Sequence, residues 1–203
     1  MQVIKSNIQK TILSVSKDIF ISNGFQKTSI RDIANQSGVS LGNIYNYFAS
    51  KDEIFLSVVY PVIIYLYKLL DSHHGKNGLD IISINDKYYF QQVLDEYFTL
   101  VSKHKDILRL LLLDSSQSRM ANFVNEYIVY SNSVVKDWFI NMKTKYPHIN
   151  IDFSDEFMAF HTFWMFETIK QVIKTETSQK QIIKTLSNFL QFEIQGWKQI
   201  IGI

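Results

Sequence analysis

The stretch TSIRDIANQSGVSLGNIYNYF, residues 28–48, decides the fold of the N-terminal region. Apolar side chains recur at helical spacing on both sides of Gly38 and predict two short helices, at about 29–36 and 41–48. Gly38 can adopt the left-handed conformation that ends the first helix, and Ser40 can cap the second by accepting a hydrogen bond from a free amide. This spacing predicts a helix-turn-helix.

The second of these helices, about two turns long, is too short to be stable alone, so its neighbours must hold it in place. Ile44 and Phe48 lie four residues apart and are expected to point toward the core. The outward positions are then Leu41, Gly42, Asn43 and Asn46, with Tyr45 and Tyr47 on the flanks.

An outward face of this composition suits the major groove of DNA. Asparagine can bond an adenine edge, leucine can contact a thymine methyl group, and glycine lets the backbone approach closely. The tyrosine hydroxyls and Lys51 can bind phosphates and set the register. The alternative is a structural three-helix unit whose tyrosines only pack, but packing alone does not require outward asparagines.

Working outward, the whole chain has the composition of a globular, all-helical protein. Its 203 residues are 46% hydrophobic and 20% charged, with two prolines and seven glycines. The absence of cysteine excludes disulfides, thiolate metal sites and cysteine nucleophiles. The first 52 residues hold six Lys/Arg and three Asp, a net charge of +3, whereas the rest of the chain carries −1. This asymmetry favours a polyanion partner for the N-terminal region.

No secretory signal is evident, and the longest apolar run, residues 58–67, contains Pro61 and is shorter than the roughly 20 residues that span a bilayer. We therefore expect a cytoplasmic protein without a membrane partner. Pro61 should kink or end the helix that contains it. The segment 73–86 is the best linker candidate because it holds two glycines and lacks helical periodicity.

The remaining helices are expected from periodicity and capping signals. Ser50–Glu53 and Ser178–Gln181 have the spacing of capping boxes that open helices. We expect two domains, residues 1–50 and 51–203. The expected helices outside the opening stretch are 4–23, one from Lys51 onward, 87–103, 105–117, 119–145, 154–175 and 179–201.

The run from Gly24 to Phe55, GFQKTSIRDIANQSGVSLGNIYNYFASKDEIF, resembles the DNA-binding signature of the TetR (tetracycline-repressor) family of bacterial transcription regulators. Two positions depart from the commonest pattern: Leu41 replaces a frequent basic residue, and Tyr47 stands where histidine is often found. The resemblance implies phosphate contacts from Thr28, Tyr45, Tyr47 and Lys51, and a place in the groove for positions 40–43 and 46, which adds Ser40 to the outward residues.

Two C-terminal helices suggest a self-complementary interface. Residues 157–166, FMAFHTFWMF, carry no charge, and the last helix has a broad apolar stripe. The resemblance likewise implies a homodimer built from these two helices of each chain. Glu193 falls within the stripe and either reaches solvent or bonds across the dimer. The interface residues we expect are Phe157, Phe160, Ile182, Leu186, Phe189, Glu193 and Trp197.

The resemblance also implies a ligand cavity among the C-terminal helices. Aromatic side chains with a few polar groups are typical of small-molecule pockets, and equally of ordinary cores. His161 lies inside an apolar run and is either a core histidine with a partner or a ligand contact. The candidate pocket residues are Tyr65, Tyr97, Phe123, Tyr127, His161 and Trp164.

No catalytic constellation is present in the sequence. His73 and His74 have no third ligand nearby and are expected in a solvated linker, so we predict no metal site and no cofactor. We predict a ligand-responsive DNA-binding transcription regulator: a repressor that a small apolar or aromatic molecule releases from a double-stranded DNA operator. The alternatives are an architectural DNA-binding protein of the same fold without an effector, and a helical enzyme or carrier, which the missing catalytic residues disfavour.

Overall fold

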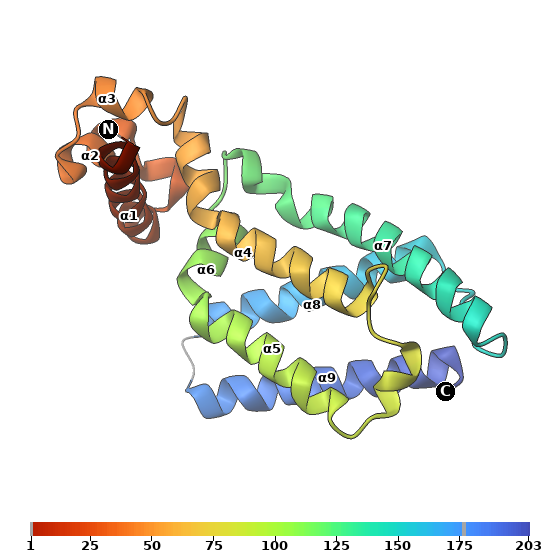
Figure 1. Cartoon of the computed structure of the whole chain (residues 1–203). Helices are drawn as coiled ribbons and strands as arrows, with labels where there is room; N and C mark the ends of the chain where they lie inside the picture. Colours follow the sequence, from red (N-terminus) through yellow and green to blue (C-terminus); the bar gives the residue numbers. More distant parts are fainter. Residues whose placement is uncertain (1, 176–177) are drawn as a thin grey trace. The chain divides into compact units, whose positions relative to one another are not determined.

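The computed structural model describes residues 2–175 and 178–203, and this part of the chain is all-helical, without strands (Figure 1). It contains nine α-helices and two short 3₁₀ helices. Their bounds are α1 Gln2–Lys27, α2 Ile30–Ser37, α3 Leu41–Tyr45, α4 Lys51–His74, η1 Ile81–Asn85, α5 Tyr89–Lys103, α6 Lys105–Leu112, η2 Arg119–Asn122, α7 Phe123–Lys145, α8 Asp155–Lys174 and α9 Gln179–Ile201. The predicted all-α fold class is confirmed.

The chain divides into two compact units. The N-terminal unit comprises Met1–Tyr65 and Asp106–Phe123, and the C-terminal unit comprises Leu66–Lys105 and Val124–Ile203. The first unit thus takes in residues beyond the helix-turn-helix, and α4 runs from one unit into the other. The boundary after residue 50 stays a prediction.

Local signals set the ends of the N-terminal helices. Ser29 caps α2 in a capping box: its hydroxyl oxygen accepts from the Asp32 amide, and the Asp32 carboxylate accepts from the Ser29 amide at 2.9 Å. The Ser29 hydroxyl also donates to this carboxylate, at 2.6 Å, and the two bonds that Ser29 donates lower the pKa of Asp32. Gly24 interrupts α1 with a φ of +73°, close to the expected stop. A non-glycine residue with this φ would be strained.

A cluster of phenylalanine rings forms the core of the N-terminal unit. The ring of Phe55, on α4, lies 5.1 Å from that of Phe20 and 5.0 Å from that of Phe25, both in edge-to-face geometry. Ile33 of α2 and Ile44 of α3 are fully buried. The short helix α3 is therefore held by burial of its inner face, as the sequence required.

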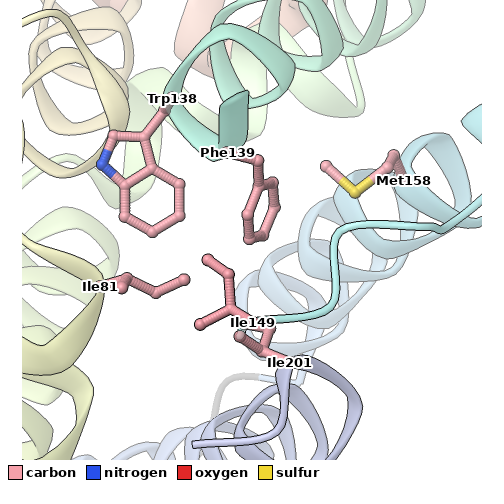
Figure 2. Packing of buried hydrophobic residues seen from close by; sticks show 6 residues of the cluster. All are labelled: Ile81, Trp138, Phe139, Ile149, Met158 and Ile201. Atoms are coloured by element: carbon pink, nitrogen blue, oxygen red, sulfur yellow. The ribbon is translucent and has the colours of Figure 1, made fainter. Parts of the chain in front are cut away.

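The C-terminal unit has a core of its own at one end of α7 and α9. Figure 2 shows Trp138 and Phe139 of α7 converging on the aliphatic side chains of Ile149 and Ile201. The indole Nε1 of Trp138 donates to the Leu79 carbonyl oxygen at 2.9 Å, which fixes the loop after α4. In this unit α5 packs against α9 and α8 (Figure 1).

Several expected bounds were wrong. The helix predicted at 41–48 is α-helical only to Tyr45, and the one predicted at 105–117 ends at Leu112. Pro61 does not end α4, which continues to His74, so the expected linker begins later than residue 73. Of the two hydrogen bonds of the second predicted capping box, the structure has the one in which the Ser178 hydroxyl accepts from the Gln181 amide, at 3.3 Å.

Candidate nucleic-acid interface and ligand cavity

The turn before α3 presents this helix as the sequence predicted. Gly38 follows α2 in the left-handed conformation, with a φ of +66°, and so redirects the chain. Ser40 caps α3 by accepting from the Asn43 amide at 3.3 Å. Because Ile44 faces the core, the opposite side of α3 faces solvent.

The outward face of α3 is exposed and polar. Leu41 is 36% exposed and Tyr45 52%, and Ser40, Gly42 and Asn46 are exposed as well. Asn43 and Tyr47 are half-buried. The Asn46 Nδ2 donates to Asn43 Oδ1 at 3.3 Å, so the two amides, both predicted to contact bases, are linked.

Two residues predicted to contact phosphates lie inside the unit instead. Thr28 is 2% exposed, and its hydroxyl donates to the Gly24 carbonyl oxygen at 2.8 Å. The Lys51 ammonium donates to the carbonyl oxygens of Phe25 and Thr28, each at 2.8 Å, and lies over the Phe25 ring. Burial lowers the pKa of Lys51. A phosphate contact from the Thr28 hydroxyl would have to replace its internal bond, whereas the Lys51 ammonium has one N–H beyond the two that these bonds use.

The structure adds residues that sequence reasoning missed. An open groove beside α3 is lined by Arg31 and Asn35 of α2 together with Gly38, Ser40 and Leu41. Arg31 and Asn35 are exposed. Their position on the solvent side of α2, one helical turn apart, was the signal available in the sequence. Arginine and asparagine are common side chains at phosphates and base edges.

The C-terminal unit encloses a cavity of two adjoining chambers, of about 190 and about 180 Å³. Of the predicted pocket residues, Tyr97, Tyr127 and His161 line both chambers, whereas Tyr65, Phe123 and Trp164 line neither. The expectation for the last three was wrong in this structure. Phe123 is buried and belongs with Tyr65 to the N-terminal unit, and Trp164 lies at the surface. The lining residues shared by the chambers include Leu70, His73, His74, Tyr89, Met165 and Trp197.

Two histidines expected in a solvated linker line this cavity. The imidazole Nε2 of His73 lies 2.6 Å from Glu96 Oε2. Burial would raise the pKa of Glu96, but the hydrogen bonds from His73 and Gln92 outweigh it and leave the pKa lowered. The buried Nδ1 of His74 has no hydrogen-bond partner, and burial lowers the pKa of His74 to about 3. Among the described residues no cluster of three or more His, Asp or Glu side chains is placed to hold a metal ion.

A second histidine–carboxylate contact joins helices α8 and α9. His161 of α8 contacts Glu193 of α9 through Nε2, and the Trp197 indole Nε1 donates to the same nitrogen at 3.0 Å. Glu193 therefore has a partner within its own chain, and its side chain is only 10% exposed, so the expectation that it reaches solvent was wrong; a bond across a dimer stays a prediction. His161 has the partner that a buried histidine requires.

The remaining interface predictions divide between surface and interior. Phe157 and Phe160 are 39% and 61% exposed, while Ile182 and Phe189 are half-buried. Leu186 is fully buried, and Trp197, like Glu193, lines the cavity, so these three do not form a free surface. Sequence reasoning missed Phe192, which is 64% exposed, and its ring contacts that of Trp164 at 5.3 Å.

The fold and this geometry define a helix-turn-helix protein with a helical, cavity-containing second unit. The family described as "Bacterial regulatory proteins, tetR family" matches residues 12–58. This match includes the whole run from Gly24 to Phe55, so the resemblance to the TetR family is confirmed over this region. The chain is 38% identical over 53 residues to the HTH-type transcriptional regulator QacR of Staphylococcus aureus, and 36% identical over 55 residues to the uncharacterized regulator YfiR of Bacillus subtilis.

These similarities are confined to part of each protein. The matched segments cover 26% and 27% of this chain, and 28% and 27% of QacR and YfiR. Over the whole length, the fold resembles NalD of Pseudomonas aeruginosa, the secondary repressor of the MexAB-OprM multidrug efflux pump, with a TM-score of 0.64 and 16% identity over 94% of this chain and 96% of NalD. It also resembles FadR of Bacillus subtilis, solved with stearoyl-CoA, with a TM-score of 0.60 and 17% identity over 92% and 98% of the two chains. All four are transcriptional regulators, not enzymes.

Proposed function

We propose that the protein is a homodimeric, cytoplasmic transcription regulator that binds a double-stranded DNA operator through α3 and leaves it when a small molecule occupies the cavity. The exposed polar face of α3, held by the buried Ile44 and the cap at Ser40, is the observation that carries the DNA-binding function. Arg31 and Asn35 extend the same surface onto α2. A dimer would present two such faces to half-sites about one turn of DNA apart.

The residues we assign to DNA differ in their roles. Leu41, Gly42, Asn43 and Asn46 read the groove, and Ser40, Tyr45 and Tyr47 support them at its edges. The remaining N–H of the Lys51 ammonium is the part of that residue that can bind a phosphate, whereas a phosphate contact from Thr28 would displace the bond of its hydroxyl to the Gly24 carbonyl. By length and composition alone, α4 is apolar enough to cross a membrane, a test that the core helix of a soluble protein also passes; 39% of its apolar window is buried inside the protein.

The cavity supports a small-molecule effector. An architectural DNA-binding protein needs no such space and would have a filled core, whereas the C-terminal unit holds two chambers lined by aromatic side chains. We propose that the effector shifts the population of the two units toward an arrangement that fits the operator poorly. The helix α4 belongs to both units and is the element we expect to carry this signal.

The decisive experiment is selection of duplexes from random DNA by the purified protein, followed by titration of the selected duplex at two salt concentrations. We expect sequence-selective binding that weakens as salt rises, because phosphate contacts release counterions. Equal, weak binding to selected and unrelated duplexes would contradict the regulator function.

Two tyrosines of nearly equal exposure in the N-terminal unit provide a matched control. Tyr45 on α3 is 52% exposed and Tyr60 on α4 is 53% exposed. Tyr45→Ala is expected to lower affinity for the selected duplex by about tenfold, a loss of one hydrogen bond to a charged group. Tyr60→Ala is expected to leave it unchanged. Equal effects of the two substitutions would remove α3 as the DNA-binding element.

A further inference from the structure

The first chamber of the cavity, the one of about 190 Å³, is lined by acidic side chains without a lysine or arginine to balance them. Glu96 of α5 and Glu193 of α9 both line it, and its other titratable lining residues are tyrosines and three histidines. The second chamber contains Asp80, but that carboxylate is paired with Lys145 and accepts from the Tyr146 hydroxyl at 3.1 Å. In the first chamber the partners of the two carboxylates are histidines, His73 for Glu96 and His161 for Glu193, so no permanently charged cation neutralises them.

The negative charges of both carboxylates affect the same side chain of this chamber, Tyr97. Burial raises the pKa of Tyr97, and the negative charges of Glu193 and Glu96 raise it further. Glu96 also raises the pKa of Tyr89, which burial brings to about 12. The hydroxyls of two tyrosines that line the chamber thus lie in the field of its carboxylates, as a bound cation would.

The contacts of His161 leave one hydrogen bond of the chamber unsatisfied. The Trp197 indole N–H can only donate, so its bond to His161 Nε2 requires that this nitrogen carry no proton. The contact of Glu193 with the same nitrogen requires a proton there. A single Nε2 cannot serve both at once. If another cation occupied Glu193, His161 would be free to accept from Trp197.

His74 supplies a second unsatisfied group. Its ring lines both chambers, and its buried Nδ1 has no hydrogen-bond partner. Because burial keeps this imidazole neutral at ordinary pH, it adds no positive charge to balance the carboxylates. A buried polar atom without a partner is costly and is a place where a ligand gains a hydrogen bond.

We propose that the first chamber binds the cationic group of an amphipathic organic ligand, with Glu96 and Glu193 as its counter-charges. This proposal names the chemical class of the effector and therefore rests on the proposed function. Besides the carboxylates, the aromatic rings of Tyr89, Tyr97 and Trp197 also line this chamber, and they attract the cationic group through cation–π interactions. The apolar part of the ligand extends into the second chamber, against Trp138 and Phe139.

The test compares three probes that share one ring system and differ in charge: (1-naphthylmethyl)ammonium, 1-naphthylmethanol and 1-naphthoate. Binding of each to the full chain is measured by isothermal titration calorimetry at pH 7.5 without DNA. We expect the ammonium probe to bind roughly 10- to 100-fold more tightly than the alcohol, the range for a hydrogen bond to a charged group. The carboxylate probe is expected to bind more weakly than the alcohol.

Variants locate the selectivity in the chamber. Glu96→Gln and Glu193→Gln each keep the shape of the side chain and remove its charge, so each is expected to reduce the preference for the ammonium probe by about tenfold or more. Glu156→Gln makes the same change at an exposed position of α8 and is expected to leave it unaltered. Circular dichroism confirms that each variant is folded, and the selectivity of the unaltered chain tests the proposal without any variant.

The proposal is overturned if 1-naphthoate binds as tightly as the ammonium probe, if none of the probes binds, or if neither cavity substitution changes the selectivity. The proposed function fails separately. If the chain binds the ammonium probe selectively but its affinity for the selected duplex does not change, the cationic ligand class is supported and the role of the ligand as effector is rejected. Release of the duplex by 1-naphthoate alone would retain the effector mechanism and reject the cationic class.

Discussion

His74 has an environment that penalises its charged form. Its ring packs edge-to-face on Trp138 with centroids 4.9 Å apart, and burial lowers its pKa from 6.5 to about 3. In the unfolded chain the imidazole binds a proton below pH 6.5, whereas in the folded chain it stays neutral until about pH 3. Protonation therefore favours the unfolded state as the pH falls through this window.

The replacement His74→Phe should remove this dependence. Between pH 6 and 4.5, the free energy of unfolding of the parent is expected to lose up to about 1.4 kcal/mol more per pH unit than that of the variant. The measurement is guanidinium unfolding at half-unit pH steps, with pH 7.5 as the reference, where the two proteins should agree within about 1 kcal/mol. Parallel curves for parent and variant would show that His74 is protonated in the folded state.

Substitutions at two glycines of the helix-turn-helix distinguish the effect of backbone strain on stability from the effect of a close backbone approach on DNA binding. Gly38 has a φ of +66° and Gly42 does not have a positive φ, and a Cβ at either position would meet nothing within 4 Å. Gly38→Ala is expected to destabilise the protein by about 1 kcal/mol through its left-handed backbone. Gly42→Ala lies in a helix and should stabilise it by roughly 0.5–1 kcal/mol.

For affinity toward DNA we expect the opposite order of the two variants. Gly42 is exposed on the outward face of α3, so its new methyl group would hold the backbone away from the groove. Thermal melts and titrations of the selected duplex should therefore rank the two variants differently: Gly42→Ala is the more stable and the weaker in DNA binding. If Gly42→Ala binds the duplex as well as the parent does, close backbone approach at this position is ruled out.

At the scale of elements, α4 is the helix whose sequence contradicts its structure. Pro61 lacks the amide that would bond to the Ser57 carbonyl, yet the helix continues for thirteen residues to His74. Burial of Val58, Val62 and Leu66 on either side of the proline provides the packing that sustains the helix. Tertiary contacts of this kind override local propensity.

Pro61→Ala tests whether the irregularity serves regulation. Alanine restores the missing hydrogen bond and is expected to raise the stability of the exposed helical position by up to about 3 kcal/mol. If the irregularity in α4 is part of the coupling, the affinity for the selected duplex, measured with and without the ammonium probe, should change by a factor of roughly 2–30. Higher thermal stability with both affinities unchanged would make Pro61 a tolerated irregularity and no more.

Elements marked by local signals were predictable from the sequence. Gly38, Ser40 and Ser178 set helix ends through their own backbone and hydroxyl groups, and the structure has those ends. Side chains whose environment depends on distant helices were not. Apolar periodicity placed Leu186 on the α9 stripe, but only the packing of α5 and α8 decides that Leu186 and Glu193 face inward while Phe192 remains outside.

At the scale of the whole molecule, α8 and α9 leave an aromatic surface uncovered in the single chain. It comprises Phe157, Phe160, Phe163, Trp164, Ile183 and Phe192, all between 37% and 64% exposed. Rings of the two helices touch at Trp164 and Phe192, so the surface is continuous across them. An apolar surface of this kind usually marks an interface, and we expect a second copy of the chain to cover it.

Phe160→Glu should separate that dimer. Phe160 is 61% exposed, so the substitution disturbs no core packing, but in a twofold interface it buries two unpaired carboxylates. The dissociation constant of the dimer is expected to rise by roughly 30-fold or more, the loss of one interface hot spot, in sedimentation equilibrium. Val129→Glu is the control because Val129, on α7, is 74% exposed and outside this surface. Dissociation caused by Val129→Glu but not by Phe160→Glu would move the interface to α7, and a parent chain that sediments as a monomer would contradict the dimer itself.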